Sequence, residues 1–117
     1  MTLNDMAKAL SLDSLTPTLP PDASAELSGG YVSDLLSDAL ANAPSGGVLV
    51  TVQVHMNVLA VAVHTELAAV IFASGRTPER AVIEKAIEER IPLYRSNESA
   101  FDVVGKLYAK GLRGPHA

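Results

Sequence analysis

Residues 47–73 read GVLVTVQVHMNVLAVAVHTELAAVIFA, and this stretch carries the strongest structural signals of the chain. Val50, Val52 and Val54 alternate with polar residues, which predicts a strand over residues 47–54. Residues 68–73 are continuously apolar, as in a strand of a parallel sheet that is buried on both faces. Residues 56–63, between them, are almost wholly apolar, so their periodicity fits a second strand or a buried helix equally well.

The segment before this stretch predicts a further strand and helix. Residues 27–32 are short and β-compatible, and Ser33 is a predicted N-cap with Asp34 in the first turn of the helix. The apolar face expected for this helix consists of Leu35, Leu36, Ala39 and Leu40. Nearer the N-terminus, residues 1–11 predict an amphipathic helix capped by Thr2 and Asp5. Residues 13–25 contain three prolines and predict a connector with at most a short edge strand.

The segment after residue 73 continues the alternation of helix and strand. Thr77, followed by Pro78 and Glu79, predicts a helix start, and residues 90–94 predict a short strand. Ser96 or Asn97 is the expected cap of a last helix that Gly111 ends. The expected buried stripes are Val82, Ile83, Ala86 and Ile87 in the first helix, and Ala100, Phe101, Val104, Leu107 and Tyr108 in the second.

This order of elements predicts an α/β fold with a mainly parallel sheet and helices on both faces. We expect residues 1–26 to form an N-terminal helix and connector packed on a domain of residues 27–112, followed by a frayed tail of residues 113–117. At 117 residues, the chain has the length of one domain.

Composition narrows the function classes. Nine Lys and Arg against 13 Asp and Glu give a net charge of −4, which argues against a nucleic-acid partner. The absence of Cys excludes disulfides, iron–sulfur ligation by this chain and thiol catalysis, and the three His have no zinc-ligand spacing. We therefore expect no cofactor. Residues 48–73 contain too many polar groups to span a membrane, and the first residues do not resemble a signal peptide, so we expect a cytoplasmic protein.

Polar residues follow each predicted strand, at the edge where open α/β sheets bind ligands. The predicted ligand-binding residues are Ser33, Asp34, Thr51, His55, Asn57, Ser74, Gly75, Arg76 and Ser96. His55 could bind an anion or act as an acid or base, or it could cap the next helix. Residues 74–76 could clamp a phosphate with backbone N–H groups and one guanidinium, or form an ordinary loop. Asp34 and Asp38 could form a carboxylate pair or an exposed acidic helix face.

Catalytic motifs are missing from the sequence. It contains no P-loop, no dinucleotide-binding glycine fingerprint after a strand and no nucleophile elbow. These absences favour a non-catalytic protein, and an enzyme that uses His55 as a general base is the third hypothesis considered below.

Two strings, YVSDLLSD at residues 31–38 and TVQVHMN at residues 51–57, together with Ala60-Val61-Ala62, resemble the DRTGG-domain family. The resemblance covers about residues 27–112 and is strongest to the short stand-alone branch often found beside iron-hydrogenase genes. It implies an α/β sandwich related to the N-terminal domain of HPr kinase/phosphorylase, with residues 56–64 as a helix. A kinase activity does not follow, because the P-loop domain that would perform it is absent from this sequence.

The resemblance also implies a regulatory or ligand-sensing role, since such domains occur fused to CBS pairs and to phosphotransacetylase. Our first hypothesis is therefore a non-catalytic module that senses a small anionic or nucleotide-like ligand at the carboxyl ends of the strands. We expect it to form a homodimer or a higher homo-oligomer, because its high aliphatic content leaves apolar surface to cover. The alternative is a protein-interaction or assembly factor for a hydrogenase-type redox complex.

Overall fold

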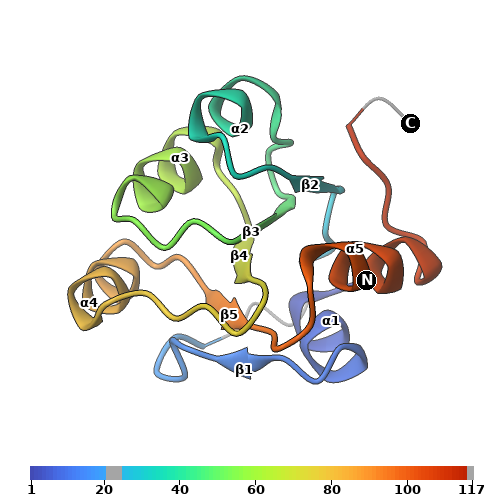
Figure 1. The fold of residues 1–117 in the computed structure, drawn as a ribbon, viewed down its shortest axis with the longest axis horizontal. Helices are drawn as coiled ribbons and strands as arrows, with labels where there is room; N and C mark the ends of the chain where they lie inside the picture. The colour runs from blue at the N-terminus through green and yellow to red at the C-terminus, as the bar shows by residue number, and fades with distance from the viewer. Residues whose placement is uncertain (21–24, 116–117) are drawn as a thin grey trace.

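A five-stranded sheet organises the molecule in a computed structural model that describes residues 1–20 and 25–115. The strands follow the order β1-β5-β4-β3-β2 (Figure 1). Four of them are parallel: β2 (Gly30–Val32), β3 (Val48–Thr51), β4 (Ala69–Phe72) and β5 (Leu93–Arg95). The short strand β1 (Asp13–Ser14) pairs with β5 in the antiparallel direction. The predicted mainly parallel sheet is thus confirmed, as is a short edge strand in the connector.

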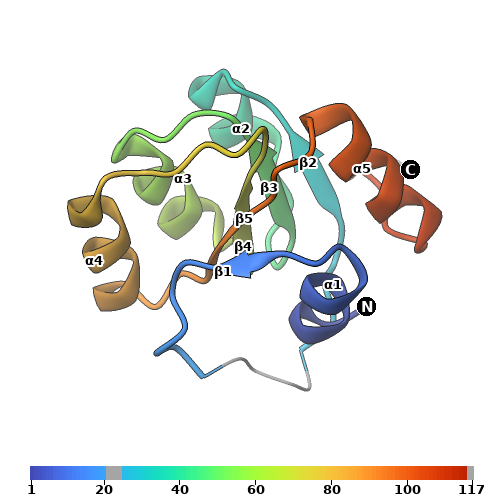
Figure 2. The same cartoon turned by 60° about the horizontal axis from the view of Figure 1, so that its bottom comes forward.

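Helices cover both faces of this sheet, as predicted. On one face lie α1 (Leu3–Ala9) and α5 (Ala100–Ala109), and on the other lie α2 (Leu36–Asn42), α3 (Asn57–Thr65) and α4 (Arg80–Glu88) (Figures 1 and 2). Residues 56–63, whose periodicity fits strand or helix, therefore belong almost entirely to a helix. A capping box between Thr2 and Asp5 starts α1, which confirms the predicted N-terminal helix.

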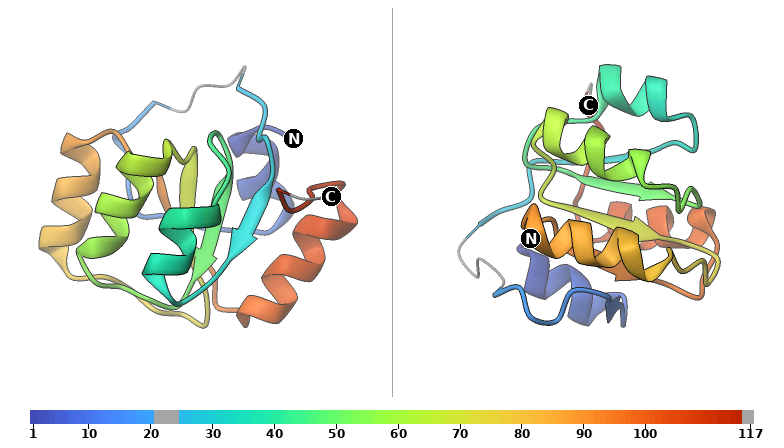
Figure 3. Two further views of the ribbon diagram at one scale, coloured as in Figure 1. Left: turned by 90° about the horizontal axis from the view of Figure 1, so that it is seen from above. Right: turned by 90° about the vertical axis from the view of Figure 1, so that its left-hand side faces the viewer.

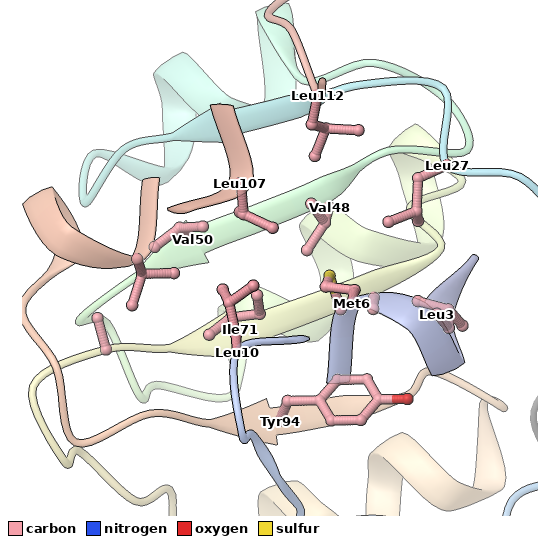
Figure 4. Packing of buried hydrophobic residues seen from close by; sticks show 13 residues of the cluster. Leu3, Met6, Leu10, Leu27, Val48, Val50, Ile71, Tyr94, Leu107 and Leu112 are labelled. Atoms are coloured by element: carbon pink, nitrogen blue, oxygen red, sulfur yellow. The ribbon is translucent and has the colours of Figure 1, made fainter. Parts of the chain in front are cut away.

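The central strands are buried on both faces. Val48, Val50 and Ile71 pack under α1 and α5, where Met6 and Leu107 reach them (Figure 4), whereas Leu49 belongs to the cluster under α2, α3 and α4. All four residues of β3 and all four of β4 are buried. The double burial confirms the continuous apolar strand predicted over residues 68–73.

The predicted strand over residues 47–54 is too long at its C-terminal end. Strand β3 stops at Thr51, and exposed Gln53 and His55 lie in the loop that follows. Val52 packs against the cluster under α1 and α5, and Val54 packs against the cluster under α2, α3 and α4, so their alternation with polar residues does not mark one face of a strand.

Three predicted helix caps are wrong by two to three residues. Helix α2 begins at Leu36 after Leu35, not after Ser33, whose Oγ instead accepts a hydrogen bond from Leu35 N at 3.2 Å. Helix α4 begins after Glu79 rather than after Thr77. Helix α5 begins after Ser99, whose Oγ accepts from Asp102 N at 3.3 Å. In each loop the expected cap residue lies upstream, in backbone that connects strand to helix.

The predicted apolar faces of α2 and α5 also differ from the faces that the structure buries. Leu35 and Leu40 of the α2 region are exposed, whereas Ala39 is buried. In α5, Val103 and Leu107 face the sheet, and Phe101 and Tyr108 are exposed. Gly111 ends α5 with a positive φ of 101°, as expected.

The C-terminal segment is tied to the sheet at Arg113. Its carbonyl accepts a hydrogen bond from Gly30 N at 2.9 Å, so the fraying predicted from residue 113 is wrong for Arg113 itself. Of the remaining tail, His116 and Ala117 lie outside the described residues, as do residues 21–24 of the connector.

Candidate functional site

The loops that follow β2, β3, β4 and β5 gather along one edge of the sheet, seen at the bottom of the left panel of Figure 3. We call this edge, formed by residues 33–35, 52–56, 73–79 and 96–99, the carboxyl edge. Its existence follows from the parallel pairing of the four strands. All of the predicted ligand-binding residues lie on it or directly beside it, and they fall into three separate clusters.

The first cluster joins Asp34 to Thr51. The Asp34 Oδ1 atom accepts hydrogen bonds from Thr51 Oγ1 at 3.0 Å and from Val52 N at 2.8 Å. Thr51 is completely buried, and its Oγ1 also accepts from Gln53 N at 3.1 Å. One carboxylate oxygen therefore fastens the loop after β2 to the end of β3.

Asp34 and Asp38 do not form a carboxylate pair. Asp38 lies in α2, where its Oδ2 accepts a hydrogen bond from the Tyr31 hydroxyl at 2.8 Å. This bond lowers the pKa of Asp38 and raises the pKa of Tyr31, because it stabilises the carboxylate and the neutral phenol together. Each aspartate thus has its own partner on a neighbouring element.

The second cluster consists of His55 and Asn57 at the start of α3. The His55 Nδ1 atom accepts a hydrogen bond at 3.1 Å from the N–H of Asn57, the first residue of α3, whereas the N-cap residue Met56 makes no side-chain cap bond. This geometry matches the helix-capping interpretation of His55. Both side chains are exposed, and the opposite ring nitrogen, Nε2, is not used in this bond.

The third cluster joins the loops after β4 and β5. Ser74 N donates to Glu98 O at 2.7 Å, and Gly75 N donates to Ser96 O at 2.8 Å. Arg76 N donates to Ala73 O at 3.2 Å. All three of these backbone N–H groups already have acceptors, which favours the ordinary-loop alternative for residues 74–76 over the phosphate clamp. The Arg76 guanidinium, on an exposed residue, is the part of that clamp that stays available.

Arg95 is the residue of this cluster that the predicted ligand-binding set omits. It is the last residue of β5 and is partly buried, and its Nη2 donates to Asn97 Oδ1 at 2.9 Å. Its Nε is buried and has no acceptor within the described part of the chain. The sequence does point to Arg95, because this arginine follows a predicted strand and directly precedes the cap candidates Ser96 and Asn97.

The charge at this corner differs from that of the whole chain. Three of the nine cationic residues, Arg76, Arg80 and Arg95, lie on or directly beside the loops after β4 and β5. The same corner also contains two acidic residues, Glu79 and Glu98, of which Glu98 is paired with Lys106 at 2.8 Å. A chain with a net charge of −4 thus places arginines where two strands end.

Two hollows lie mostly outside these clusters. One, of about 300 Å³, lies between β2 and α5. The other, of about 600 Å³, is a groove between α3 and α4, and Asn57 is the predicted site residue that lines it. Within residues 1–20 and 25–115, no group of three or more acidic or histidine side chains is arranged to hold a metal ion.

No helix in the described parts of the chain combines the length and apolar character needed to cross a membrane.

Comparison with known proteins identifies a similar fold. No protein family and no curated protein matches the sequence significantly. Among solved structures, the chain resembles the crystal structure of the CBS and DRTGG domains of the regulatory region of Clostridium perfringens pyrophosphatase, complexed with its activator, diadenosine tetraphosphate. The TM-score is 0.68 at 14% sequence identity, and the match covers 91% of this chain. It spans 45% of that structure's chain, or a little under half.

Proposed function

We propose that this chain is a non-catalytic regulatory module that binds a small anionic, nucleotide-like ligand at the carboxyl edge, between the loops after β4 and β5. The observation that carries the proposal is the buried Arg95 Nε, which has no acceptor in the described structure. It lies at the edge of a parallel sheet where ligands of α/β proteins bind. A phosphate group on the ligand would supply the acceptor.

The energetics favour an anion at this position. A buried N–H group without an acceptor costs about 1–3 kcal/mol, and a ligand oxygen that accepted from it would recover that cost. Arginine forms two parallel hydrogen bonds with a phosphate, which are stronger than bonds between neutral groups. Arg76 would add a second guanidinium from the neighbouring loop, since Gly75 is joined to Ser96 of the Arg95 loop.

The other predicted residues would shape this edge and could contact the ligand from its sides. Asp34 and Thr51 hold β2 and β3 in register at their ends, and His55 orders the start of α3. Ser96 is buried and its Oγ accepts from Glu98 N at 3.1 Å, which fixes the loop that follows Arg95. These contacts would keep the edge in one conformation before the ligand binds.

The fold comparison supports a regulatory role at a general level. The pyrophosphatase structure is that of a regulatory region, in complex with a nucleotide activator. Two adenosines joined by four phosphates form an anion of the class that Arg76 and Arg95 would bind. This is why diadenosine tetraphosphate belongs among the first ligands to test.

An enzyme that uses His55 as a general base has less support. A catalytic histidine is normally oriented by a carboxylate or a similar third group. Among the described residues, the partner of the His55 ring is the backbone N–H of Asn57. The His55 ring therefore stabilises the start of α3 in this structure.

Isothermal titration calorimetry with AMP, ATP, diadenosine tetraphosphate and inorganic pyrophosphate tests the proposal. We expect at least one of these anions to bind, and Arg95→Gln and Arg76→Gln to weaken binding about tenfold or more. Arg90→Gln is the matched control, because exposed Arg90 precedes β5 at the opposite edge of the sheet. Binding that Arg95→Gln and Arg76→Gln leave unchanged, or no binding of any anion, would refute the site.

A further inference from the structure

The face formed by β2 and α5 exposes large apolar side chains. Phe101 is 88% exposed, Tyr108 is 58% exposed, and Val32 on the edge strand β2 is 48% exposed. Phe101 and Tyr108 are seven residues apart, which places them on one side of α5. Helix α5 itself lies at the right of Figure 2. Large apolar side chains exposed together on one face are typical of a surface that another molecule covers.

Gly105 lies between these two aromatic residues, and nothing near it in the chain requires a glycine. A Cβ atom built at Gly105 would meet no atom within 4 Å, and the residue sits in the interior of a ten-residue helix. Glycine is among the least favourable residues at such a position. Because no contact within this chain requires a glycine here, we interpret Gly105 as a position where the backbone of another molecule approaches closely.

The same face contains a hollow whose α5 wall begins at Val104, about one helical turn after the protruding Phe101. The hollow of about 300 Å³ between β2 and α5 is mostly apolar and is lined by Gly30, Tyr31, Val32, Val50, Val104, Leu107, Tyr108, Leu112, Arg113, Gly114 and Pro115. At one end, the Arg113 guanidinium stacks over the Tyr108 ring, with its carbon 3.7 Å from the ring centre. One face therefore carries both an apolar protrusion and an apolar recess of matching chemistry.

The charges along α5 favour one relative orientation of two such faces. Asp102 lies in the first turn of α5, and Arg113 lies beyond its C-terminal end. Two copies of α5 in antiparallel orientation would place Asp102 of each copy near Arg113 of the other. A parallel orientation would instead place like charges together.

We propose that a second copy of this chain docks on the β2–α5 face. The two α5 helices cross antiparallel near Gly105, and Phe101 of each copy enters the hollow between β2 and α5 of the other. Because Phe101 and Tyr108 lie on either side of Gly105, a two-fold axis at Gly105 brings Phe101 of one copy to Tyr108 of its mate. The same patch is used by both copies, as two-fold symmetry requires.

Phe101 and Tyr108 would supply the centre of the interface and the rest of the patch its surrounding area. Each aromatic side chain buries about 150–250 Å² when fully covered. Phe101, Tyr108 and the apolar walls of the hollow form the centre of a patch that reaches from β2 to the C-terminal segment. A standard interface needs about 800 Å² from each partner, and an aromatic centre of this kind supplies its dominant binding residues.

Sedimentation velocity over a range of concentrations tests the proposal. We expect the wild-type chain to be a dimer at micromolar concentration and Phe101→Asp to weaken the dimer at least about tenfold. The variant should fold, because Phe101 is exposed and an acidic residue suits the first turn of a helix. Leu40→Asp is the matched control, since Leu40 is 44% exposed on α2, which covers the opposite face of the sheet.

Gly105→Leu provides a second variant that cannot act by unfolding the helix. Leucine favours the helix more than glycine does, and the space around Gly105 is open. We expect this variant to keep its circular dichroism spectrum and to become a monomer. A wild-type chain that is monomeric at every concentration would overturn the assignment of a second copy. A dimer that survives both Phe101→Asp and Gly105→Leu would overturn the assignment of this face.

Discussion

At the scale of single residues, Thr51 shows how a buried polar group can define an edge. Its hydroxyl donates to Asp34 and accepts from Gln53 N, so both hydrogen-bonding roles of the group are used. The side chain has no exposed surface. The polar residue that ends β3 is therefore tolerated in the core because its partners come from the two loops of the carboxyl edge.

We predict that Thr51→Val destabilises the protein by about 1–3 kcal/mol, because Gln53 N loses its acceptor and Asp34 loses one donor. Urea denaturation measures the change. Asp34→Asn is the control and should cost less, since an amide oxygen can still accept from Thr51 and Val52. A Thr51→Val protein as stable as the wild type would contradict this role.

The hydrogen bond between Tyr31 and Asp38 makes stability depend on pH. It lowers the pKa of Asp38, so the carboxylate contributes stability above its usual pKa, and this contribution is lost as the pH falls through the lowered value. The pKa of Tyr31 is raised, so the contribution of the neutral phenol is present below its usual pKa and is lost as the pH rises through the raised value.

We predict that Tyr31→Phe moves the pKa of Asp38 back up towards its usual range, because the strongest hydrogen bond to the carboxylate is removed. An NMR titration of the side-chain carboxyl carbons measures this change. The pKa of Asp5, which is lowered by its bonds to Thr2, should stay where it is and serves as the internal control. An unchanged titration of Asp38 would show that Tyr31 does not stabilise its charge.

At the scale of secondary-structure elements, the start of α3 depends on His55. We predict that His55→Ala lowers the stability by about 1 kcal/mol, in the range of a lost helix cap. Thermal denaturation measures the loss, and His55→Asn, which retains a side-chain acceptor, should recover most of it. A melting temperature unchanged by His55→Ala would refute the capping role and would favour the hypothesis that His55 is a catalytic base.

The central strand β4 cannot accommodate a charged side chain. Val70 is fully buried, and β4 pairs with β3 on one side and with β5 on the other. We predict that Val70→Asp unfolds the chain, because an unpaired buried charge costs several kcal/mol against a total stability of about 5–15 kcal/mol. Circular dichroism checks this. Val63→Asp, on an exposed part of α3, is the matched control and should fold.

The sequence predicts the elements better than it predicts their limits. Runs such as residues 68–73 identify buried strands because burial on both faces leaves no room for polar residues. The helix starts are less predictable because Ser, Thr and Asp serve loops as well as helices, as the bond from Leu35 N to Ser33 Oγ shows. In α5, apolar residues occupy two sides of the helix, so periodicity alone does not tell Val103, which is buried, from Phe101, which is exposed.

The position of the candidate site could be predicted from the sequence, but which hydrogen-bond donors remain free there could not. Parallel strands bring the four loops to one edge whatever the loop sequences are. Whether a loop N–H is free depends on the partner loop, and the bond from Gly75 N to Ser96 O joins residues that are 21 positions apart in the chain. The unpartnered Nε of Arg95 is likewise a property of three-dimensional packing.

At the scale of the whole molecule, the two proposed surfaces occupy different parts of the fold. Arg76 and Arg95 lie at the ends of β4 and β5, whereas the β2–α5 face lies at the other side of the sheet, beyond β3. Ligand binding and self-association should therefore be separable by mutation. We predict that Phe101→Asp retains the anion affinity of the wild type and that Arg95→Gln retains its oligomeric state, as calorimetry and sedimentation on both variants would establish.

The most direct test of the central claim is an NMR titration of ¹⁵N-labelled protein with diadenosine tetraphosphate and, separately, with inorganic pyrophosphate. We predict that the largest shifts of the amide resonances fall on residues 74–76 and 95–98, where the loops after β4 and β5 meet. Titration of the Arg95→Gln variant should reduce them. Shifts confined to the β2–α5 face, or no shifts at saturating anion, would contradict a ligand site at the carboxyl edge.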